Sequence, residues 1–234
     1  MAPLAARRCG KRAEVTTAFV LSGGGSLGAV QVGMFSALAD RDVQADLLIG
    51  TSAGAINAAF VAGHGAGRES LDRLAAIWVG LRRRDVFPLA PLRQALAMTG
   101  ARPSLFSSDA LRRLVVANLA YRNLEEAAIP VHIVATDLMT GREVLLSSGD
   151  ATDAVLASAA IPGVFPPVAR EGLTLIDGGV SDNAGLSHAV SLGADEIYVL
   201  PTGYACALVR PPATAMQALS RFWRAQALTF GDTW

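Results

Sequence analysis

A single serine in this sequence stands in a turn that has little side-chain bulk. The apolar run 47–49 leads into the pentapeptide GTSAG, and a helix-like run of small and apolar residues follows directly. The pentapeptide comprises Gly50, Thr51, Ser52, Ala53 and Gly54. It matches G-x-S-x-G, the strained strand-to-helix turn that raises a nucleophilic serine above a sheet. Ser52 is therefore the candidate nucleophile. The alternative is that five small residues only pack a helix tightly against a strand.

An earlier strand-to-helix turn is rich in glycine and has three interpretations. It comprises Ser22, Gly23, Gly24, Gly25, Ser26, Leu27 and Gly28. The spacing of Gly23, Gly25 and Gly28 fits the G-x-G-x-x-G fingerprint of a dinucleotide-binding domain, which needs an acidic residue at the end of the second strand. Here the second strand ends at residues 50–52, where no acid stands, and the nearest acidic residues precede that strand.

The other two interpretations of this turn are a simple tight turn and an oxyanion hole. Consecutive glycines lose backbone entropy on folding without a gain in packing, which disfavours the simple turn. Glycine amides can approach a carbonyl oxygen closely, and an esterase serine needs such donors, each worth roughly 2.7–4 kcal/mol of barrier. The residues alone leave these interpretations open.

A nucleophilic serine also needs a base, and histidine is the usual one. His132 lies inside an apolar strand-like run and His64 at a glycine-rich helix exit, so neither suits the role. His188 follows Ser52 and Asp177 in the chain order of the α/β-hydrolases, although it falls in a short amphipathic run. A Ser52–Asp177–His188 triad acting on small esters is therefore one alternative.

Asp177 is the clearer candidate for the acid or base. It ends the apolar run 173–176 and is followed by Gly178 and Gly179. Carboxyl ends of parallel strands gather at one edge of a sheet, and Ser52 also follows the carboxyl end of a strand, so the two side chains can meet. The alternative is an ordinary Asp-Gly turn, which is frequent.

Strand-like and helix-like runs alternate along the chain. We predict strands at 16–22, 45–50, 129–138, 142–148, 172–177 and 195–201. We predict helices at 28–40, 53–63, 70–80, 108–119, 152–160 and 185–192, with a last helix-like segment near the end of the chain. Such alternation implies a three-layer α/β/α fold with a mostly parallel central sheet. We expect a flexible tail at 1–14, one catalytic domain at 15–234, and an irregular, partly helical excursion at 82–104.

The composition narrows the class of protein. Of the 234 residues, 52% are hydrophobic and 17% charged, which supplies a rich core and argues against disorder. The formal net charge is +0, so no basic field is available to hold nucleic acid. No run reaches the ~18 apolar residues of a membrane span, and the N-terminus lacks the apolar core of a signal peptide. We therefore expect a soluble cytoplasmic protein; no pattern predicts an oligomeric state.

The glycine-rich turn, the G-x-S-x-G turn and the Asp-Gly-Gly strand end, in that order on alternating strands, resemble the patatin-like phospholipases. The stretches SAAIPGVFPPV (158–168) and DNAGLSHAVSLGADEIYVL (182–200) are also similar to that family, and the resemblance covers roughly residues 16–206. It implies a serine–aspartate dyad without histidine, with Ser52 as nucleophile and Asp177 as base. It also implies that the reaction needs no metal or cofactor.

The resemblance further implies an oxyanion hole and a class of substrate. The amides of Gly23, Gly24 and Gly25, with that of Ala53, would hold the oxyanion. The motifs that carry the resemblance also contain Gly28, Gly50, Gly54, Gly178 and Gly179. The implied substrates are acyl esters of phospholipids, galactolipids or neutral lipids. Leu27 stands where many members carry Arg or Lys, so a strict preference for phospholipids is not expected.

Peripheral contact with a membrane is expected from an exposed apolar loop with basic neighbours, since only a short segment follows the region of resemblance. The best candidate is the run 82–92. It contains Arg82, Arg83, Arg84, Phe87, Pro88, Leu89 and Leu92. We expect the arginines to meet anionic head groups while Phe87 and Leu89 enter the acyl boundary. The alternative is a solvated helix end followed by a loop packed on the core.

Overall fold

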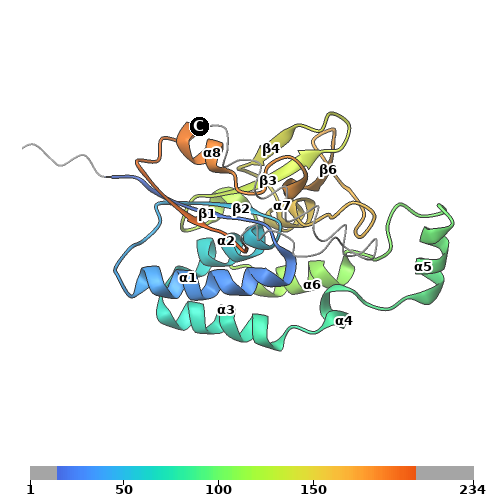
Figure 1. Ribbon diagram of the computed structural model, residues 1–234, viewed down its shortest axis with the longest axis horizontal. Helices are drawn as coiled ribbons and strands as arrows, with labels where there is room; N and C mark the ends of the chain where they lie inside the picture. The colour runs from blue at the N-terminus through green and yellow to red at the C-terminus, as the bar shows by residue number, and fades with distance from the viewer. Residues whose placement is uncertain (1–14, 204–234) are drawn as a thin grey trace, which may run out of the picture.

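A seven-stranded sheet forms the centre of the described molecule (Figure 1). The computed structural model describes residues 15–203, so the tail and the final helix-like segment expected from the sequence lie outside the described residues. The strands are β1 (Thr17–Leu21), β2 (Leu47–Thr51), β3 (Val131–Asp137), β4 (Glu143–Leu146), β5 (Val168–Arg170), β6 (Leu173–Asp177) and β7 (Glu196–Leu200). All six predicted strands are confirmed, and β5 was not predicted.

The sheet is mixed, and its parallel part lies at its centre. The strand order is β5-β6-β3-β2-β1-β7, with β4 also paired to β3. Strands β3, β2, β1 and β7 run parallel to one another, whereas β4 and β6 run antiparallel to β3, and β5 antiparallel to β6. The prediction of a mostly parallel sheet is confirmed, although the strand that carries Asp177 is one of those that run the other way.

One face of the sheet carries most of the helices and the larger core (Figure 1). These helices are α1 (Ala29–Ala39), α2 (Ala53–His64), α3 (Arg68–Gly80), α6 (Asp109–Asn118) and α7 (Ala151–Ser158). Phe19 and Leu48 of the sheet and Phe35 of α1 are each at most 1% exposed in this core. Helix α2 is buried along nearly its whole length, which explains its lack of a charged face.

The opposite face of the sheet is covered by α8 (Leu186–Ser191). Ala189 of this helix packs in a smaller core with Val20, Ile49 and Val134, whose side chains point away from the larger core. The strands are thus apolar on both faces, as parallel strands between two layers must be. The three-layer expectation is confirmed.

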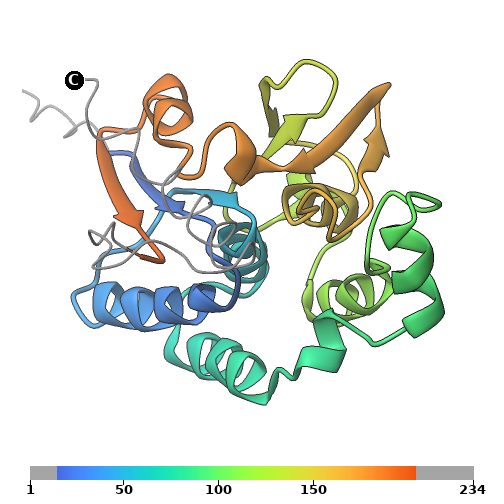
Figure 2. The same ribbon diagram turned by 45° about the vertical axis from the view of Figure 1, so that its right-hand side comes forward.

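The excursion at 82–104 contains two short helices, α4 (Arg83–Val86) and α5 (Pro91–Met98). Figure 2 shows α5 at the edge of the molecule, away from the sheet. The glycine-rich turn and the residues after β6 form single 3-10 turns, η1 (Gly25–Gly28) and η3 (Gly178–Val180), and another, η2, spans Leu124–Glu126. No helix among residues 15–203 combines the length and the apolar character that crossing a bilayer requires.

Candidate active site

Ser52 occupies a strained backbone position between β2 and α2. Its φ is 53° and its ψ is −117°, a conformation that costs a non-glycine residue on the order of 1–3 kcal/mol. The flanking glycines are required sterically, because a Cβ on Gly54 would lie 2.3 Å from the carbonyl oxygen of Leu21 and one on Gly50 would lie 2.6 Å from Cα of Ala55. The sequence predicted a tight strand-to-helix turn at this position. The structure has that turn, and it shows the steric reason for the small flanking residues.

The hydroxyl of Ser52 is joined directly to the carboxylate of Asp177. Ser52 Oγ donates a hydrogen bond to Asp177 Oδ2 at 2.7 Å. The amide of Gly179 donates to the other oxygen, Oδ1, at 2.8 Å. Both residues are nearly enclosed, with Ser52 7% and Asp177 3% exposed. Asp177 is thus held by its own turn with one oxygen left for the serine.

The two residues meet because β2 and β6 approach each other head to head along one edge of β3. Val134 pairs with Thr51 on one side and with β4 on the other, and Ala135 pairs with Asp177 on one side and with β4 on the other. β2 and β6 therefore share the edge of β3 that β4 leaves open, and their carboxyl ends face each other at adjacent positions. The expectation that Ser52 and Asp177 meet is borne out geometrically, but the reason given for it, parallel strands, is wrong.

The close approach of the two strand ends also needs a glycine after Asp177. A Cβ on Gly178 would lie 2.3 Å from the carbonyl oxygen of Val134. Gly179 follows with its amide on the carboxylate, and a Cβ there would lie 3.1 Å from Asp177 Oδ1. The Asp-Gly-Gly sequence is thus more than a frequent turn, since a side chain at Gly178 would collide with the backbone of Val134 and the amide of Gly179 holds the carboxylate.

Burial tunes the carboxylate toward basicity. Loss of water around Asp177 raises its pKa to about 6, and the hydrogen bonds from Ser52 and Gly179 oppose that rise. A carboxyl with this pKa is ionised at neutral pH but is a stronger base than a solvated aspartate. Such a value suits a group that accepts a proton during a reaction near pH 7.

A second serine, Ser158, holds the backbone of the strained nucleophile through a hydrogen bond. The amide of Ser52 donates to Ser158 Oγ at 2.8 Å, and Ser158 Oγ donates in turn to the carbonyl of Val134 at 2.5 Å. Ser158 is 0% exposed, at the end of α7. The resemblance included this residue in the stretch 158–168, but nothing in the sequence indicated its role.

The glycine-rich turn lies beside the serine, and its amides are not all available. The amide of Gly23 donates to the carbonyl of Asn183 at 3.2 Å, so in this structure it is engaged. The amides of Gly24 and Gly25 donate to no other residue within 15–203, and that of Ala53 opens α2, where helix amides lack carbonyl partners. Of the four amides expected to form an oxyanion hole, those of Gly24, Gly25 and Ala53 are therefore the candidates left without a partner among residues 15–203.

A chain of buried amide groups holds the shape of this glycine-rich turn. Gln31 Nε2 donates to the carbonyls of Ser22 and Leu200, both at 2.9 Å. Asn57 Nδ2 donates to the carbonyl of Gly28 at 2.9 Å and to Gln31 Oε1 at 2.8 Å, and Asn57 Oδ1 accepts from Trp78 Nε1 at 2.8 Å. Gln31 and Asn57 are both 0% exposed. Sequence reasoning missed them, although two amides inside apolar helices are an unusual pattern.

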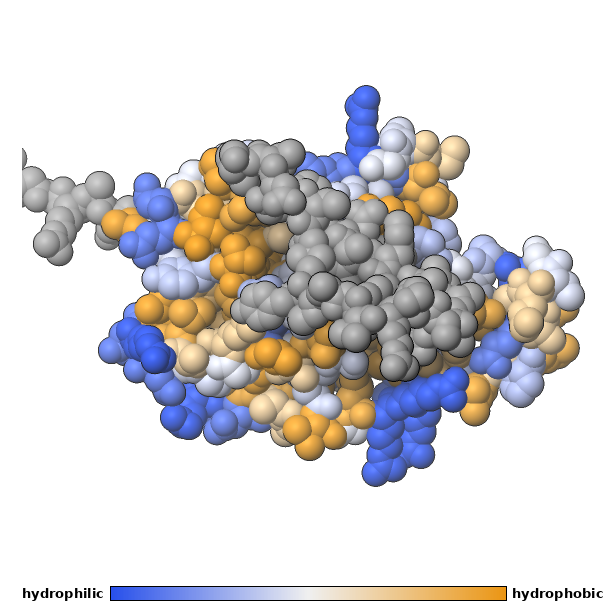
Figure 3. Space-filling view, viewed as in Figure 1, coloured by the Kyte–Doolittle hydropathy of each residue, from blue (hydrophilic) through white to orange (hydrophobic). Residues whose placement is uncertain are grey.

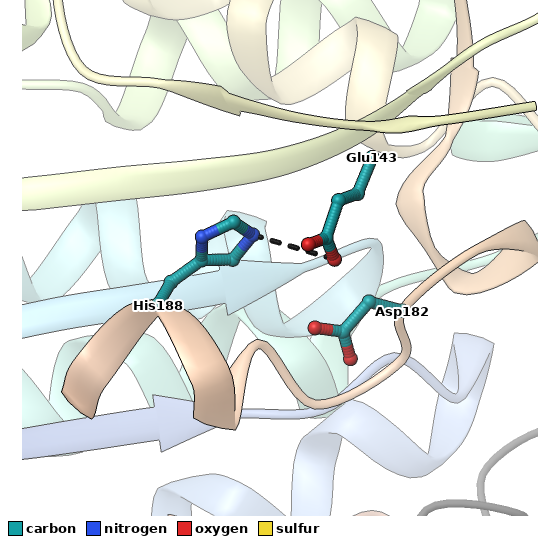
Figure 4. Close-up of side chains that lie close together, drawn as sticks. All are labelled: Glu143, Asp182 and His188. Carbon is teal, nitrogen blue, oxygen red and sulfur yellow. Dashed lines mark ion pairs between the residues drawn. The ribbon is translucent and has the colours of Figure 1, made fainter. Parts of the chain in front are cut away.

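The alternative triad is contradicted. His188 lies on α8, on the opposite face of the sheet from the larger core, and its Nε2 is 3.5 Å from Glu143 Oε2 (Figure 4). Both oxygens of Asp177 are already engaged by Ser52 and Gly179. The order of residues along the chain suggested the triad, and the topology separates them.

The groups around His188 are also chemically different from those around Ser52. His188, Glu143 and Asp182 bring one ligand atom each within 4.8 Å of one another, the one group of this kind among residues 15–203 that could share a metal ion (Figure 4). His132 bonds Ser147 at 2.7 Å, and burial lowers its pKa. None of these groups contacts Ser52 or Asp177, so a metal there would not touch the serine.

An apolar cavity of about 170 Å³ begins at Ser52 and extends between helices. Its lining residues come from η1, α2, α3, α4, α6 and α7 and the segments that follow them. They include Gly25, Ser26, Ala53, Ile56, Phe60, Leu74, Trp78, Phe87, Leu111, Val115, Leu119, Val155 and Phe165. The cavity can hold an apolar chain whose polar end lies at the serine and the free amides.

The dinucleotide interpretation of the glycine-rich turn loses its remaining support. The residue after β2 is Ser52, engaged with Asp177, and the side of the turn that faces Ser52 opens into an apolar cavity. No acidic side chain stands where a ribose would need one. An α/β sheet with a buried serine–aspartate pair at a strand end is instead typical of acyl hydrolases that act without a catalytic histidine.

Comparison with known proteins places the chain. It belongs to the patatin-like phospholipase family, whose model matches residues 19–190. It is 29% identical to Lysophospholipase NTE1 of Pyricularia oryzae and 30% identical to Lysophospholipase nte1 of Aspergillus terreus, over 207 residues in each case. Both alignments cover 86% of this chain but only 13% and 12% of those proteins, so the chain spans a small part of their length.

A solved structure supports the fold independently. The crystal structure of VipD from Legionella pneumophila matches with a TM-score of 0.54 at 18% identity, over 81% of this chain and 50% of that chain. The likeness concerns the arrangement of sheet and helices. The expectation of a patatin-like fold is confirmed by this match and by the family assignment.

Proposed function

We propose that this chain is a carboxylic ester hydrolase that cleaves acyl esters of lipids through a Ser52–Asp177 dyad. The observation that carries the proposal is the 2.7 Å hydrogen bond from Ser52 Oγ to Asp177 Oδ2, without an intervening histidine. The raised pKa of Asp177 supports its role as base. The family assignment and the printed name of the two fungal relatives, lysophospholipase, support the lipid class.

In the acylation step, Asp177 takes the hydroxyl proton of Ser52 while Oγ attacks the ester carbonyl carbon. The carbonyl oxygen becomes an oxyanion, which the amides of Gly24, Gly25 and Ala53 stabilise together with the N-terminal dipole of α2. The tetrahedral intermediate then expels the alcohol, which receives the proton from Asp177. An acyl-Ser52 ester remains.

In the deacylation step, a water molecule replaces the alcohol and follows the same path in reverse. Asp177 accepts a proton from that water as its oxygen attacks the acyl carbon. The intermediate expels Ser52 Oγ, which regains its proton, and the fatty acid leaves. The proton count closes with Asp177 ionised and Ser52 neutral, so the dyad needs no further group.

The acyl chain fits the apolar cavity. The lining of this cavity includes Ile56 and Phe60, which follow Ser52 along α2, and Leu111 and Val115 of α6. A cavity of about 170 Å³ favours one acyl chain per turnover, so we infer single-chain esters as the best soluble probes. Leu27, in place of a basic residue, adds no charge for a phosphate beside the glycine-rich turn. We therefore propose that neutral and lysophospholipid esters are both accepted.

Fluorophosphonate labelling tests the proposal directly. A fluorophosphonate should label Ser52 in the purified protein, and hydrolysis of p-nitrophenyl acyl esters and of a lipid panel should stop in Ser52→Ala. The change removes only the hydroxyl, so the fold should survive. Ser191→Ala, an exposed serine on α8, is the matched control and should leave both labelling and hydrolysis unchanged. Hydrolysis by Ser52→Ala near the wild-type rate would overturn the nucleophile assignment.

A further inference from the structure

Helix α5 carries its apolar side chains on the outside. None of its residues is buried, and Leu92 and Leu96, one turn apart, are 76% and 37% exposed. Leu89 just before the helix is 69% exposed, and Met98 at its end is 82% exposed. A helix in water normally shows the opposite arrangement, with its apolar stripe facing the core.

The polar anchor of α5 faces inward. Arg93 Nη2 donates to Ser104 Oγ at 3.2 Å and to the carbonyl of Phe106 at 3.1 Å, and Ser104 is 1% exposed. Arg93 therefore anchors the helix to the rest of the protein. In this orientation the leucines of α5 face outward. This orientation is part of the folded structure.

The same segment concentrates positive charge. Residues 81–107 contain five arginines and one aspartate, an excess of four positive charges in a chain whose formal net charge is +0. Arg82, Arg83 and Arg84 are exposed, and Asp85 is used locally, where it accepts from the amide of Arg82 at 2.8 Å. Figure 3 shows strongly hydrophilic residues beside α4 and apolar residues mixed with polar ones over α5.

The segment is also continuous with the wall of the cavity. Val86 and Phe87 line the cavity that begins at Ser52, and the ring of Phe87 stacks on Phe165 with centroids 5.4 Å apart. Phe87 also lies edge-on to Phe106, at 5.3 Å. The expectation that Phe87 enters a membrane is therefore wrong, because its ring faces inward. Leu89 is directed outward as expected.

We propose that the α4–α5 surface docks the protein on an anionic lipid bilayer. This surface is defined as Arg82, Arg83, Arg84, Leu89, Leu92, Leu96 and Met98. The proposal rests on the proposed function, because a lipid hydrolase must reach substrate held in a bilayer. The arginines meet anionic head groups, and the leucines and methionine enter the acyl boundary beside them.

The choice of a bilayer as partner follows from the chemistry of the surface. Exposed apolar side chains beside exposed arginines are the pattern of a segment that binds at a membrane interface. Docking through α5 sets the neighbouring Val86 and Phe87, and with them the wall of the cavity, next to the lipid. An acyl chain leaving the bilayer there passes along the apolar lining toward Ser52.

Sedimentation with vesicles tests the docking surface. The vesicles are phosphatidylcholine alone and phosphatidylcholine with phosphatidylserine, each at low and high salt. We expect Arg82→Ser/Arg83→Ser/Arg84→Ser to lose roughly 10–100-fold in binding to the anionic vesicles at low salt. Leu92→Gln/Leu96→Gln should lose at least about tenfold on the anionic vesicles under both salt conditions, because the acyl contact is not screened.

Matched controls separate the surface from general charge and hydrophobicity. Arg41→Ser/Arg122→Ser/Arg142→Ser removes the same charge from three exposed positions elsewhere, and Val190→Ser/Leu192→Ser removes exposed apolar groups from α8. Leu192 follows the last residue of α8, and Val190 lies within it. Both control variants should bind vesicles like the wild type. Equal loss in the charge control, or full binding by both α4–α5 variants, would overturn the proposal.

Soluble-ester hydrolysis distinguishes this proposal from the proposed function. Both α4–α5 variants should hydrolyse a p-nitrophenyl acyl ester like the wild type while hydrolysis of vesicle lipid falls with binding. Loss of soluble-ester hydrolysis in a folded α4–α5 variant would contradict a pure docking role. Failure of the wild type to hydrolyse any ester would count against the proposed function. The vesicle-binding measurements would still test the α4–α5 docking surface in that case.

Discussion

The hydroxyl of Ser52 reaches Oδ2 of Asp177 at 2.7 Å because the two residues stand at the facing ends of β2 and β6. Both strands use the same edge of β3, one arriving parallel to it and the other antiparallel. The pairing of the backbones of β2 and β6 with β3 therefore sets the distance between the two side chains. Neither depends on a flexible loop for its position.

The first prediction concerns which residue acts as the base. Asp177→Asn keeps the shape of the side chain but cannot accept a proton, so ester hydrolysis should fall within the ~10²–10⁴-fold range usual for loss of a general base. His188→Ala should change the rate little, because His188 pairs with Glu143 on the other face of the sheet. Steady-state rates on a soluble ester measure both. A folded but inactive His188→Ala protein would rule out the dyad.

The second prediction is the pH dependence of activity. Asp177 acts only when ionised, and its pKa is raised to about 6 by burial. Activity should therefore be constant above pH about 7 and should fall about tenfold per unit once the pH is well below 6. The kcat/KM profile on a soluble ester measures this limb. Because a histidine base would titrate nearby, the profile of His188→Ala is the control, and disappearance of the limb in that variant would contradict the assignment.

The third prediction is that the catalytic carboxylate costs stability. A folded-state pKa of about 6, above the ordinary aspartate value of 3.8, means that the native protein holds this proton more tightly than the unfolded chain does. Stability due to this group is therefore full below pH about 4 and is lost as the pH rises through 6, by about 3 kcal/mol in total.

Asp177→Asn should remove that loss. At pH 8 the variant should gain up to about 3 kcal/mol in free energy of unfolding relative to the wild type, and the gain should vanish near pH 4. The asparagine oxygen can still accept from the amide of Gly179, and its NH2 group can donate to Ser52 Oγ, so both contacts are kept although the bond with the serine reverses direction. Denaturant titrations at the two pH values measure the difference. A variant that is less stable than the wild type at pH 8 would show that the ionised carboxylate is not strained.

The parts of this site that depend on residues close together in the chain could be predicted from the sequence. The G-x-S-x-G and Asp-Gly-Gly patterns predicted the two turns, since Gly50, Gly54 and Gly178 each lie where a side chain would collide with a neighbouring backbone. The apolar runs also predicted the strands, most directly β1 and β2, because strands buried on both faces are continuous apolar runs. These signals lie within a few residues of one another in the chain.

The parts that could not be predicted depend on distant pairing. Nothing local to β6 indicates that it runs antiparallel to β3, and Ser158 meets the amide of Ser52 across 106 residues of sequence. The sequence analysis expected Leu92 to be exposed but did not include Leu96 or Met98, because the amphipathic pattern of a helix does not say which face will meet the body. Arg93 decides that orientation through contacts made 11 and 13 residues later.

The last prediction concerns Ser158, which we expect to be a positioning residue. Its Oγ accepts from the amide of Ser52 and donates to the carbonyl of Val134, and it touches no reacting atom. Ser158→Ala leaves both buried groups without a partner, which should cost about 1–3 kcal/mol of stability for each. With its amide released, the strained φ of Ser52 should relax and misplace the hydroxyl relative to Asp177. We therefore expect kcat on a soluble ester to fall with KM nearly unchanged, and fluorophosphonate labelling to slow in parallel. Ser158→Thr keeps the hydroxyl and should recover labelling more than stability, because its extra methyl group must fit in a fully buried site. A folded Ser158→Ala protein with unchanged kcat would show that Asp177 and the flanking glycines hold Ser52 without help.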